Sequence, residues 1–350
     1  MSYFVGEFNL KGNHVMKLRM AVMGFRHGHI MGIYGAKRED LEIVGACEED
    51  AKTRGELARA GKVKITHDNF RKMLDELDFE VLAVGDYYGR RGEIILEALK
   101  RGKHVICDKP ICTQPGQIDE IKEIAQNGKL SVGCQFDLRS SGIFRALRNS
   151  IREGAIGEVH AVSFNGQHPL SYGSRPAWYF EDGKHGGTIN DIAIHAIDAI
   201  PWMTGNRFVK IEAARNWNAG FPQVKHFKNA ALMMLTMDNG CGVLGDVSYF
   251  APDSFGYSLP QYWRFTLWGE GGMIEANIKD AVLYRNGEKE PRKIELLPQA
   301  EMFYLDCFLR EIRGEGRDDD LTTGDVLTSS RATLLAQQAA DQGLYEVALE

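Results

Sequence analysis

The chain of 350 residues is longer than most single domains, so two domains are expected. Hydrophobic residues make up 44% and charged residues 26%, as in soluble globular proteins, and no apolar run is long enough to span a membrane. The net charge of −6, with basic residues scattered along the chain, argues against nucleic-acid binding. Neither nucleic acid nor a membrane is therefore an expected partner.

Residues 1–16 lack the apolar core of a signal peptide, so we interpret them as an N-terminal extension. The six cysteines are widely spaced and include no Cys-x-x-Cys pair, which favours free thiols over zinc ligands or disulfides. Free thiols are typical of a reducing compartment, and a cytoplasmic location is expected.

Residues 17–137 alternate apolar runs with helix-like segments. The apolar runs lie at 18–24, 42–47, 65–66, 81–84, 104–107 and 130–134. Helices are expected at 28–38, at 50–60, after a cap at Asp68, and at 90–101. Apolar strands that are each followed by a helix indicate a parallel sheet covered on both faces. Six such strands predict an α/β doubly wound Rossmann domain that binds a dinucleotide.

The pattern changes in residues 138–350, where longer strands and fewer helices are expected. Strands are predicted at 159–166, 209–216, 230–237, 241–249, 262–268 and 273–284, and Asn239-Gly240 predicts a hairpin turn. Helices are predicted at 140–153, 188–203, 301–313 and 324–342. This half is interpreted as an α+β domain with a large open antiparallel sheet.

The segment Gly24 to His29 follows the first strand and opens a helix, where a dinucleotide fingerprint belongs. The match to G-x-G-x-x-G is partial, because Arg26 and His29 occupy two glycine positions and Gly28 is one place out of register. Glu48 ends the second strand, at the place of an acid that holds ribose hydroxyls. Because a carboxylate there repels a 2′-phosphate, NAD is favoured over NADP.

Lys109 follows the strand at 104–107, and ligands bind at the carboxyl ends of such strands. A lysine there could stabilise an alkoxide or carbonyl oxygen, although taken alone it could equally be a surface lysine before a turn.

Asp191, His195 and Asp198 lie at i, i+4 and i+7 of an otherwise apolar helix, where ionisable groups are costly to bury without a purpose. The histidine suits proton transfer near neutral pH. One alternative is a capping aspartate with a core histidine. Another is a metal site, but no third ligand is apparent from the spacing, so no metal is expected.

These motifs resemble the glucose–fructose oxidoreductase/inositol dehydrogenase (Gfo/Idh/MocA) family over residues 17 to about 342. The family motif G-K-H-V-x-x-E-K-P is matched at 102–110, with Asp108 in place of glutamate. The motif G-G-x-x-x-D-x-x-x-H-x-x-D is matched at 186–198, and residues 153–159 and 268–272 resemble two further family segments. One departure lies at 86–91, where the family usually has T-P-N-x-x-H.

The resemblance implies a Rossmann domain joined to an open antiparallel sheet, bound NAD(P), and a homodimer or homotetramer formed through that sheet. It implies that His195 is the acid/base, that Lys109 stabilises the oxyanion, that Asp191 orients substrate or lysine, and that Asp198 orients His195. The expected cofactor contacts are Gly24, Phe25, Arg26, His27, Gly28, His29, Glu48, Asp86, Tyr87, Arg91, Asp108 and Lys109. The candidate substrate contacts are Asp137, Arg139, Arg175, Trp178, Tyr179 and Asp198.

The expected activity is hydride transfer between NAD(P) and a hydroxyl or carbonyl carbon of a small polyhydroxylated substrate, such as a sugar, polyol or sugar acid. Two alternatives remain open at this point. One is an NAD-dependent glycosidase of the same fold, and the other is a non-catalytic sensor that binds NAD or a sugar.

Overall fold

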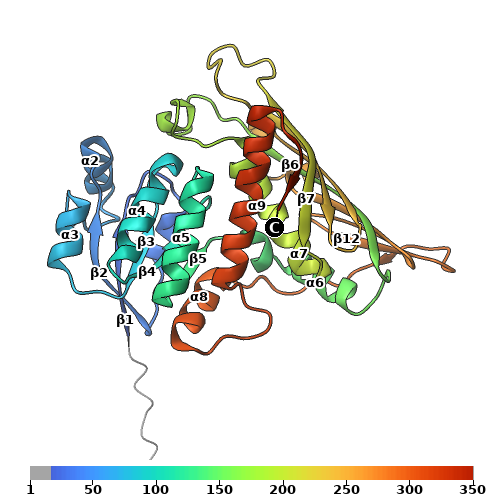
Figure 1. Cartoon of the computed structure of the whole chain (residues 1–350), viewed down its shortest axis with the longest axis horizontal. Helices are drawn as coiled ribbons and strands as arrows, with labels where there is room; N and C mark the ends of the chain where they lie inside the picture. Colours follow the sequence, from blue (N-terminus) through green and yellow to red (C-terminus); the bar gives the residue numbers. More distant parts are fainter. Residues whose placement is uncertain (1–16, 350) are drawn as a thin grey trace, which may run out of the picture.

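The computed structural model describes residues 17–349, and the extension expected at residues 1–16 lies outside them. Its first sheet, at the left of Figure 1, has five strands in the order β2-β1-β3-β4-β5. Every neighbouring pair in this sheet is parallel, which confirms the Rossmann-type topology. The strands are β1 (Leu18–Met23), β2 (Leu41–Cys47), β3 (Val81–Val84), β4 (His104–Cys107) and β5 (Val132–Cys134).

The first sheet has one strand fewer than the sequence predicts. Residues 65–66 do not form a strand, because Thr66 and His67 both donate their N–H groups to the Ala46 carbonyl, and only a single bridge joins Cys47 to His67. The predicted cap is also wrong by one residue, since Asn69 rather than Asp68 caps α3. The helices are α1 (Ile30–Tyr34), shorter than predicted, α2 (Ala51–Ala60), α3 (Phe70–Glu76), α4 (Tyr88–Lys100) and α5 (Pro115–Gly128).

The second sheet has nine strands in the order β13-β12-β11-β10-β6-β9-β8-β7-β14. All neighbours are antiparallel except β6 and β9, so the sheet is mixed and mostly antiparallel. Its strands are β6 (Val159–Pro169), β7 (Phe208–Trp217), β8 (Ala230–Met237), β9 (Gly242–Ala251), β10 (Arg264–Gly269), β11 (Gly272–Asn277), β12 (Ala281–Arg285), β13 (Arg292–Lys293) and β14 (Tyr345–Ala348).

Two turns of this sheet bear on the sequence predictions. The hairpin at Asn239-Gly240 is confirmed between β8 and β9, with a φ of +83° at Gly240 alone. The single strand predicted at 273–284 is wrong, because the chain reverses between β11 and β12. Asn277 stabilises that reversal by donating its backbone N–H to the Asp280 carbonyl, at 2.9 Å, and its amide to the Asp280 carboxylate, at 2.6 Å.

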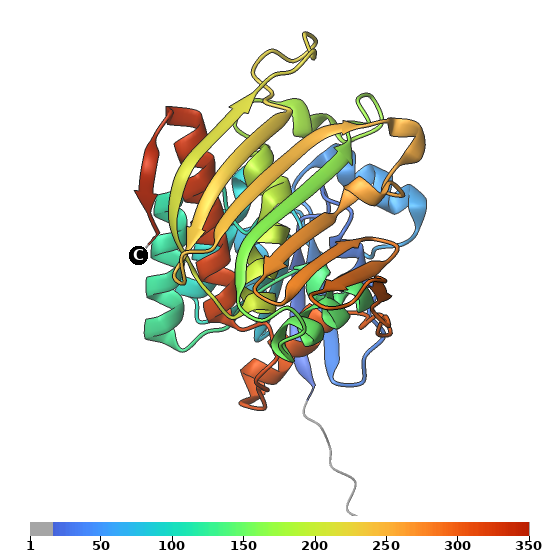
Figure 2. The ribbon, with the colours of Figure 1, turned by 90° about the vertical axis from the view of Figure 1, so that its right-hand side faces the viewer.

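Among the described residues 17–349, helices cover one face of the second sheet and not the other. The helices α6 (Gly142–Arg152), α7 (Ile194–Thr204) and α9 (Thr323–Gln342) lie between the two sheets, and the opposite face of the second sheet is open (Figures 1 and 2). A π-helical turn at Ile189–Ala193 precedes α7. No helix within residues 17–349 is both long and apolar enough to cross a bilayer.

Two hydrophobic cores lie on either side of α9. The helix α8 (Phe303–Arg313) packs onto the first sheet, and its Leu305 and Phe308 belong to the Rossmann core. The chain therefore returns to the first domain after completing most of the second sheet. A domain boundary at residue 137, as expected from the sequence, would place α8 in the second domain although it packs in the core of the first.

Candidate active site

The turn after β1 brings the dinucleotide-type loop against β3. Gly24 has a φ of +83°, and a Cβ there would lie 2.6 Å from the Asp86 backbone nitrogen, so only glycine fits. Gly28 has open space around it, while Phe25 is buried against Tyr34. The loop thus retains the tight turn of a dinucleotide-binding crossover but carries large side chains where glycines are usual.

Arg26 lies across the ends of β2 and β3. Its Nε is 3.5 Å from a Glu48 carboxylate oxygen and 3.3 Å from an Asp86 oxygen, yet it is buried without a hydrogen-bond acceptor. Glu48 accepts backbone N–H groups from Phe25, at 2.8 Å, and Asp50, at 2.9 Å. Burial raises the pKa of Glu48, and Asp86 adds to this effect. Arg26 also lies over the Tyr87 ring, and Glu48, the acid expected to hold a ribose, is fully buried beside it.

Arg91 does not lie where the sequence interpretation places it. The guanidinium is fully buried and donates to the backbone carbonyls of Asp86, Asp108, Lys109 and Pro110 at 2.6–3.0 Å. Its remaining contact is the Asp108 carboxylate, at 3.2 Å. The expected cofactor contact is therefore wrong for Arg91, which instead fixes the turn that carries Lys109.

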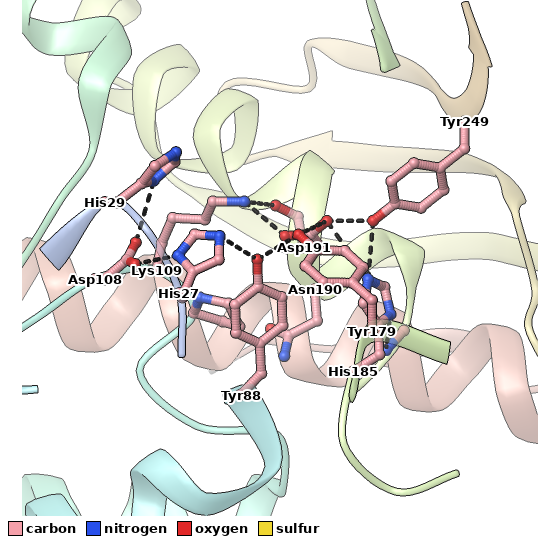
Figure 3. Close-up of polar contacts among 12 residues, drawn as sticks. His27, His29, Tyr88, Asp108, Lys109, Tyr179, His185, Asn190, Asp191 and Tyr249 are labelled. Carbon is pink, nitrogen blue, oxygen red and sulfur yellow. Dashed lines mark hydrogen bonds and ion pairs between the residues drawn. The ribbon is translucent and has the colours of Figure 1, made fainter. Parts of the chain in front are cut away.

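Lys109 and Asp191 form a buried pair between the two domains (Figure 3). The Lys109 ammonium donates to the Asp191 carboxylate at 2.6 Å and to the Asp191 carbonyl at 2.7 Å. Tyr249 donates to the other carboxylate oxygen, and Tyr179 reaches the same atom at 3.4 Å. Burial would raise the pKa of Asp191, but Lys109 and His185 hold it well below its usual value. Asp191 is thus an ionised carboxylate that positions the Lys109 ammonium.

The Gly-Gly motif and the π-helical turn explain how Asp191 reaches this place. Gly186 and Gly187 have φ values of +80° and +98°, and added Cβ atoms would meet Thr113 at 2.3 Å and Gln337 at 2.2 Å. The chain therefore passes tightly between the domains before Asp191. A π turn holds more residues than an α turn and is frequent at functional sites.

His195 lies one turn further along, in α7, and shares a cavity with Lys109 and Asp191. Burial lowers its pKa well below 6.5, and Lys109 and His168 add to this effect, so the imidazole is neutral at pH 7. Its Nδ1 is buried without a hydrogen-bond partner. The cavity has a volume of about 360 Å³ and is lined by His27, His29, Lys109, Asp137, Leu138, Ser141, Phe144, His168, Arg175, Tyr179, Asp191, His195, Tyr257, Tyr262, Trp263 and Ile278.

Several cavity residues escaped the sequence analysis. His168 is the penultimate residue of β6, and burial lowers its pKa to about 3. Tyr257, Tyr262 and Trp263 lie in the connection from β9 to β10. The only available signal was the density of aromatic residues in that connection. Tyr249 lies in β9, and the alternating pattern of that strand does not indicate which buried residue contacts the Lys109–Asp191 pair.

The candidate substrate residues fall into two groups. Asp137, Arg175 and Tyr179 line the cavity, and Arg175 donates to the carbonyls of Pro169 and Leu170 at 2.9 and 3.0 Å. The remaining three do not line this cavity. Trp178 donates its indole N–H to the Arg26 carbonyl at 3.0 Å. Arg139 and Asp198 form a buried ion pair with N–O distances of 2.7–2.8 Å.

The role expected for Asp198 is therefore wrong. Its carboxylate contacts Arg139 and Ser329, and neither residue is His195. The spacing i, i+4, i+7 is regular only in an α-helix, and the π turn changes the angular position of Asp191 relative to Asp198. Asp198 and Arg139 instead border a second cavity of about 960 Å³.

Comparison with known proteins identifies the family and supports the fold. The family model described as "Oxidoreductase family, NAD-binding Rossmann fold" matches residues 18–136, and "GFO/IDH/MocA C-terminal domain" matches residues 144–275. The chain is 25% identical to an inositol 2-dehydrogenase of Serratia proteamaculans, over 89% of this chain and 83% of that protein. It is also 25% identical to a D-glucoside 3-dehydrogenase of Escherichia coli, over 72% and 69%.

Among solved structures, a Thermotoga maritima protein assigned as an oxidoreductase aligns with a TM-score of 0.82 and 26% identity, covering 94% of this chain and all of that one. Fold and site together define a two-domain oxidoreductase with an NAD-binding Rossmann fold. The chain belongs to the GFO/IDH/MocA family, as its sequence motifs predicted.

Proposed function

We propose that this protein is an NAD(H)-dependent dehydrogenase that oxidises a secondary hydroxyl of a sugar, polyol or sugar acid. The observation that carries the proposal is the meeting of a buried ammonium, an ionised carboxylate and a neutral imidazole on one cavity between the domains. Lys109, Asp191 and His195 supply these groups. The names of the two dehydrogenase relatives support a polyhydroxylated substrate.

The residues at the β1 turn fit NAD. Gly24 makes the tight turn after β1, Glu48 follows β2 where ribose hydroxyls would bind, and the buried Arg26 Nε lacks an acceptor that a pyrophosphate oxygen would provide. The Glu48 carboxylate favours NAD over NADP, because it would repel a 2′-phosphate.

The reaction needs a base for the hydroxyl proton and a cation for the oxygen. His195 is uncharged at neutral pH and is therefore ready to accept the proton. Lys109 donates to the same oxygen and stabilises the negative charge that develops on it. Asp191, which accepts a hydrogen bond from Tyr249, holds the ammonium in place. When bound, NAD supplies the hydride acceptor.

The remaining cavity wall supports a monosaccharide-sized substrate. A volume of about 360 Å³ is at the lower end of the range for small-molecule sites. Asp137 and His168 offer polar atoms for hydroxyl groups, and Trp263 offers an apolar face for C–H bonds. Arg175 supplies the positive charge that would bind the carboxylate of a sugar acid.

The test is a panel of sugars, polyols and sugar acids assayed by NADH absorbance, followed by replacement of Lys109. Lys109→Ala should lower kcat at least about a hundredfold, the usual loss when an oxyanion partner is removed. Lys122→Ala, on the exposed face of α5, is the matched control and should leave kcat unchanged. A near wild-type rate in Lys109→Ala would refute the assignment.

We further propose that two copies associate through the open face of the second sheet. Leu232, Met234 and Leu244 project from β8 and β9 with 44–57% of their surface exposed, in a shallow depression of about 550 Å³. Exposed apolar patches of this kind mark protein interfaces. Sedimentation of wild type and Leu244→Glu tests the proposal, which fails if the wild type sediments as a monomer.

A further inference from the structure

We propose that His27, His29 and Asp108 form a binding site for a divalent transition-metal ion of the zinc type in the wall of the active-site cavity. One ligand atom from each residue lies within 4.8 Å of the others. Two imidazole nitrogens and one carboxylate oxygen are ligands that Zn²⁺ and similar ions accept. We call these three residues the His/Asp cluster.

The backbone positions the His/Asp cluster without help from any ion. His27 and His29 flank Gly28 in the loop after β1, and Asp108 follows β4, so both segments lie at the carboxyl edge of the first sheet. Figure 3 shows the three side chains close together. The two imidazole rings have centroids 4.5 Å apart. His29 occupies a position where the dinucleotide fingerprint has glycine, so its presence needs a separate explanation.

The spacing on one side of the His/Asp cluster suits a tetrahedral ion. His29 Nδ1 lies 3.4 Å from Asp108 Oδ1. Two ligands bound to Zn²⁺ at about 2.0–2.1 Å in tetrahedral geometry are separated by about 3.4 Å. Asp108 Oδ1 is buried and has no hydrogen-bond partner. A buried carboxylate oxygen without a donor is costly, and an ion between these two atoms would remove that cost.

On the other side of the cluster, a hydrogen-bond chain starts at His27 Nε2 and runs to Asp191. His27 Nε2 lies 3.2 Å from the Tyr88 hydroxyl. The Tyr88 hydroxyl is 2.6 Å from the Tyr179 hydroxyl, and the Tyr179 hydroxyl is 3.4 Å from the Asp191 carboxylate. If each group donates toward Asp191, His27 carries its proton on Nε2. His27 Nδ1 is in direct contact with the Asp108 carboxylate, and with the proton on Nε2 both atoms are acceptors. A cation bound by both side chains would replace this repulsion with attraction. Metal-binding histidines usually donate their other N–H in this way.

The surroundings leave room for an exogenous fourth ligand. His27 is buried and Asp108 is fully enclosed, whereas the His29 side chain is 46% exposed, and both histidines line the cavity with Lys109. Three protein ligands with one open position are typical of a metal site that takes water or a substrate oxygen. The positive charge of Arg91 and Lys109 is offset by the carboxylates of Asp108, Asp137 and Asp191, so a divalent ion does not enter a positively charged pocket.

The experiment measures metal binding by the full chain without any assay of activity. EDTA-treated protein is titrated with Zn²⁺ in a calorimeter, and with Co²⁺ while the visible bands of tetrahedral cobalt are followed. We expect one ion per chain, with an affinity at least about a hundredfold weaker in His29→Ala, which removes a half-exposed ligand and leaves the core intact. Asp108→Asn should weaken binding as well.

His160→Ala is the matched control, because His160 is a half-exposed histidine on β6, outside the His/Asp cluster. It should bind the ion as tightly as the wild type. Absence of binding to the wild type, or equal affinity in wild type and His29→Ala, would overturn the proposal and leave His27 and Asp108 as a hydrogen-bonded pair that shares a proton.

Discussion

The buried ion pair between Arg139 and Asp198 allows a quantitative test of its role. Arg139→Met leaves the Asp198 carboxylate buried with only the Ser329 hydroxyl, at 3.3 Å. Leaving one member of a buried pair without its partner costs about 3–5 kcal/mol. Asp198→Leu should cost less, toward the lower end of that range, because Arg139 retains a contact with the partly exposed Asp325 at 3.3 Å.

The double variant Arg139→Met/Asp198→Leu separates a structural pair from a catalytic one. Apolar side chains of similar size remove both buried charges, so its free energy of unfolding should return to within about 1–2 kcal/mol of wild type. Urea unfolding followed by tryptophan fluorescence measures this, since Arg139 lies over the Trp202 ring. Additive losses in the double variant would refute the reasoning, as would a stable Asp198→Leu protein that has lost turnover.

Three further predictions address the cofactor turn and the buried histidines. Gly24→Ala should destabilise the protein by at least about 1–2 kcal/mol and weaken NAD binding, because the new Cβ would clash with Asp86 and because alanine disfavours the positive φ at this position. Thermal unfolding measures the first effect, and NAD titration measures the second. Glu48→Gln should raise the KM for NAD more than that for NADP, since an amide no longer repels a 2′-phosphate. Burial lowers the pKa of His27 to about 4 and of His168 to about 3, so both are neutral when folded. In metal-free protein, the free energy of unfolding should be constant above pH 6.5 and should decrease as the pH drops below 6.5. The loss should reach about 2 kcal/mol per histidine at pH 5, and denaturant unfolding at each pH measures it.

Each of these predictions has a contrary outcome. Gly55→Ala, in the middle of α2 with open space around it, should be neutral or stabilising, so equal losses in Gly24→Ala and Gly55→Ala would contradict the steric argument. An unchanged ratio of the two KM values would remove Glu48 from the ribose site. Stability that stays constant from pH 8 to pH 5 would mean that the two imidazoles are not held neutral.

The sequence predicts most of the strands because their signals are local. Apolar runs followed by helices identify the parallel sheet, and alternating patterns identify the longer strands of the second sheet. The errors fall where local signals are weak or shared. Residues 65–66 are apolar enough for a strand but make a single bridge. The run at 273–284 contains a reversal whose side-chain contacts only the structure reveals.

The site was predictable only in part, for a related reason. Lys109, Asp191 and His195 occupy motif positions, and the structure places all three on one cavity. Residue type alone does not say whether a buried charge faces a ligand or another charge. Arg91 and Asp198 were therefore assigned to the site, although they contact backbone carbonyls and Arg139. Tyr249 and His168 come from separate strands, and their positions beside the active-site groups depend on tertiary packing that local sequence does not encode.

The helix α9 has a consequence for how the molecule unfolds. Val326 and Leu334 belong to the Rossmann core, while Ala332 and Ala336 of the same helix belong to the core beneath the second sheet. One rigid element is thus shared by both hydrophobic interiors. Removing it would expose apolar surface on both sides at once, so we expect the two halves to unfold together. A fragment cut at the first domain's apparent end would lack part of its own interior.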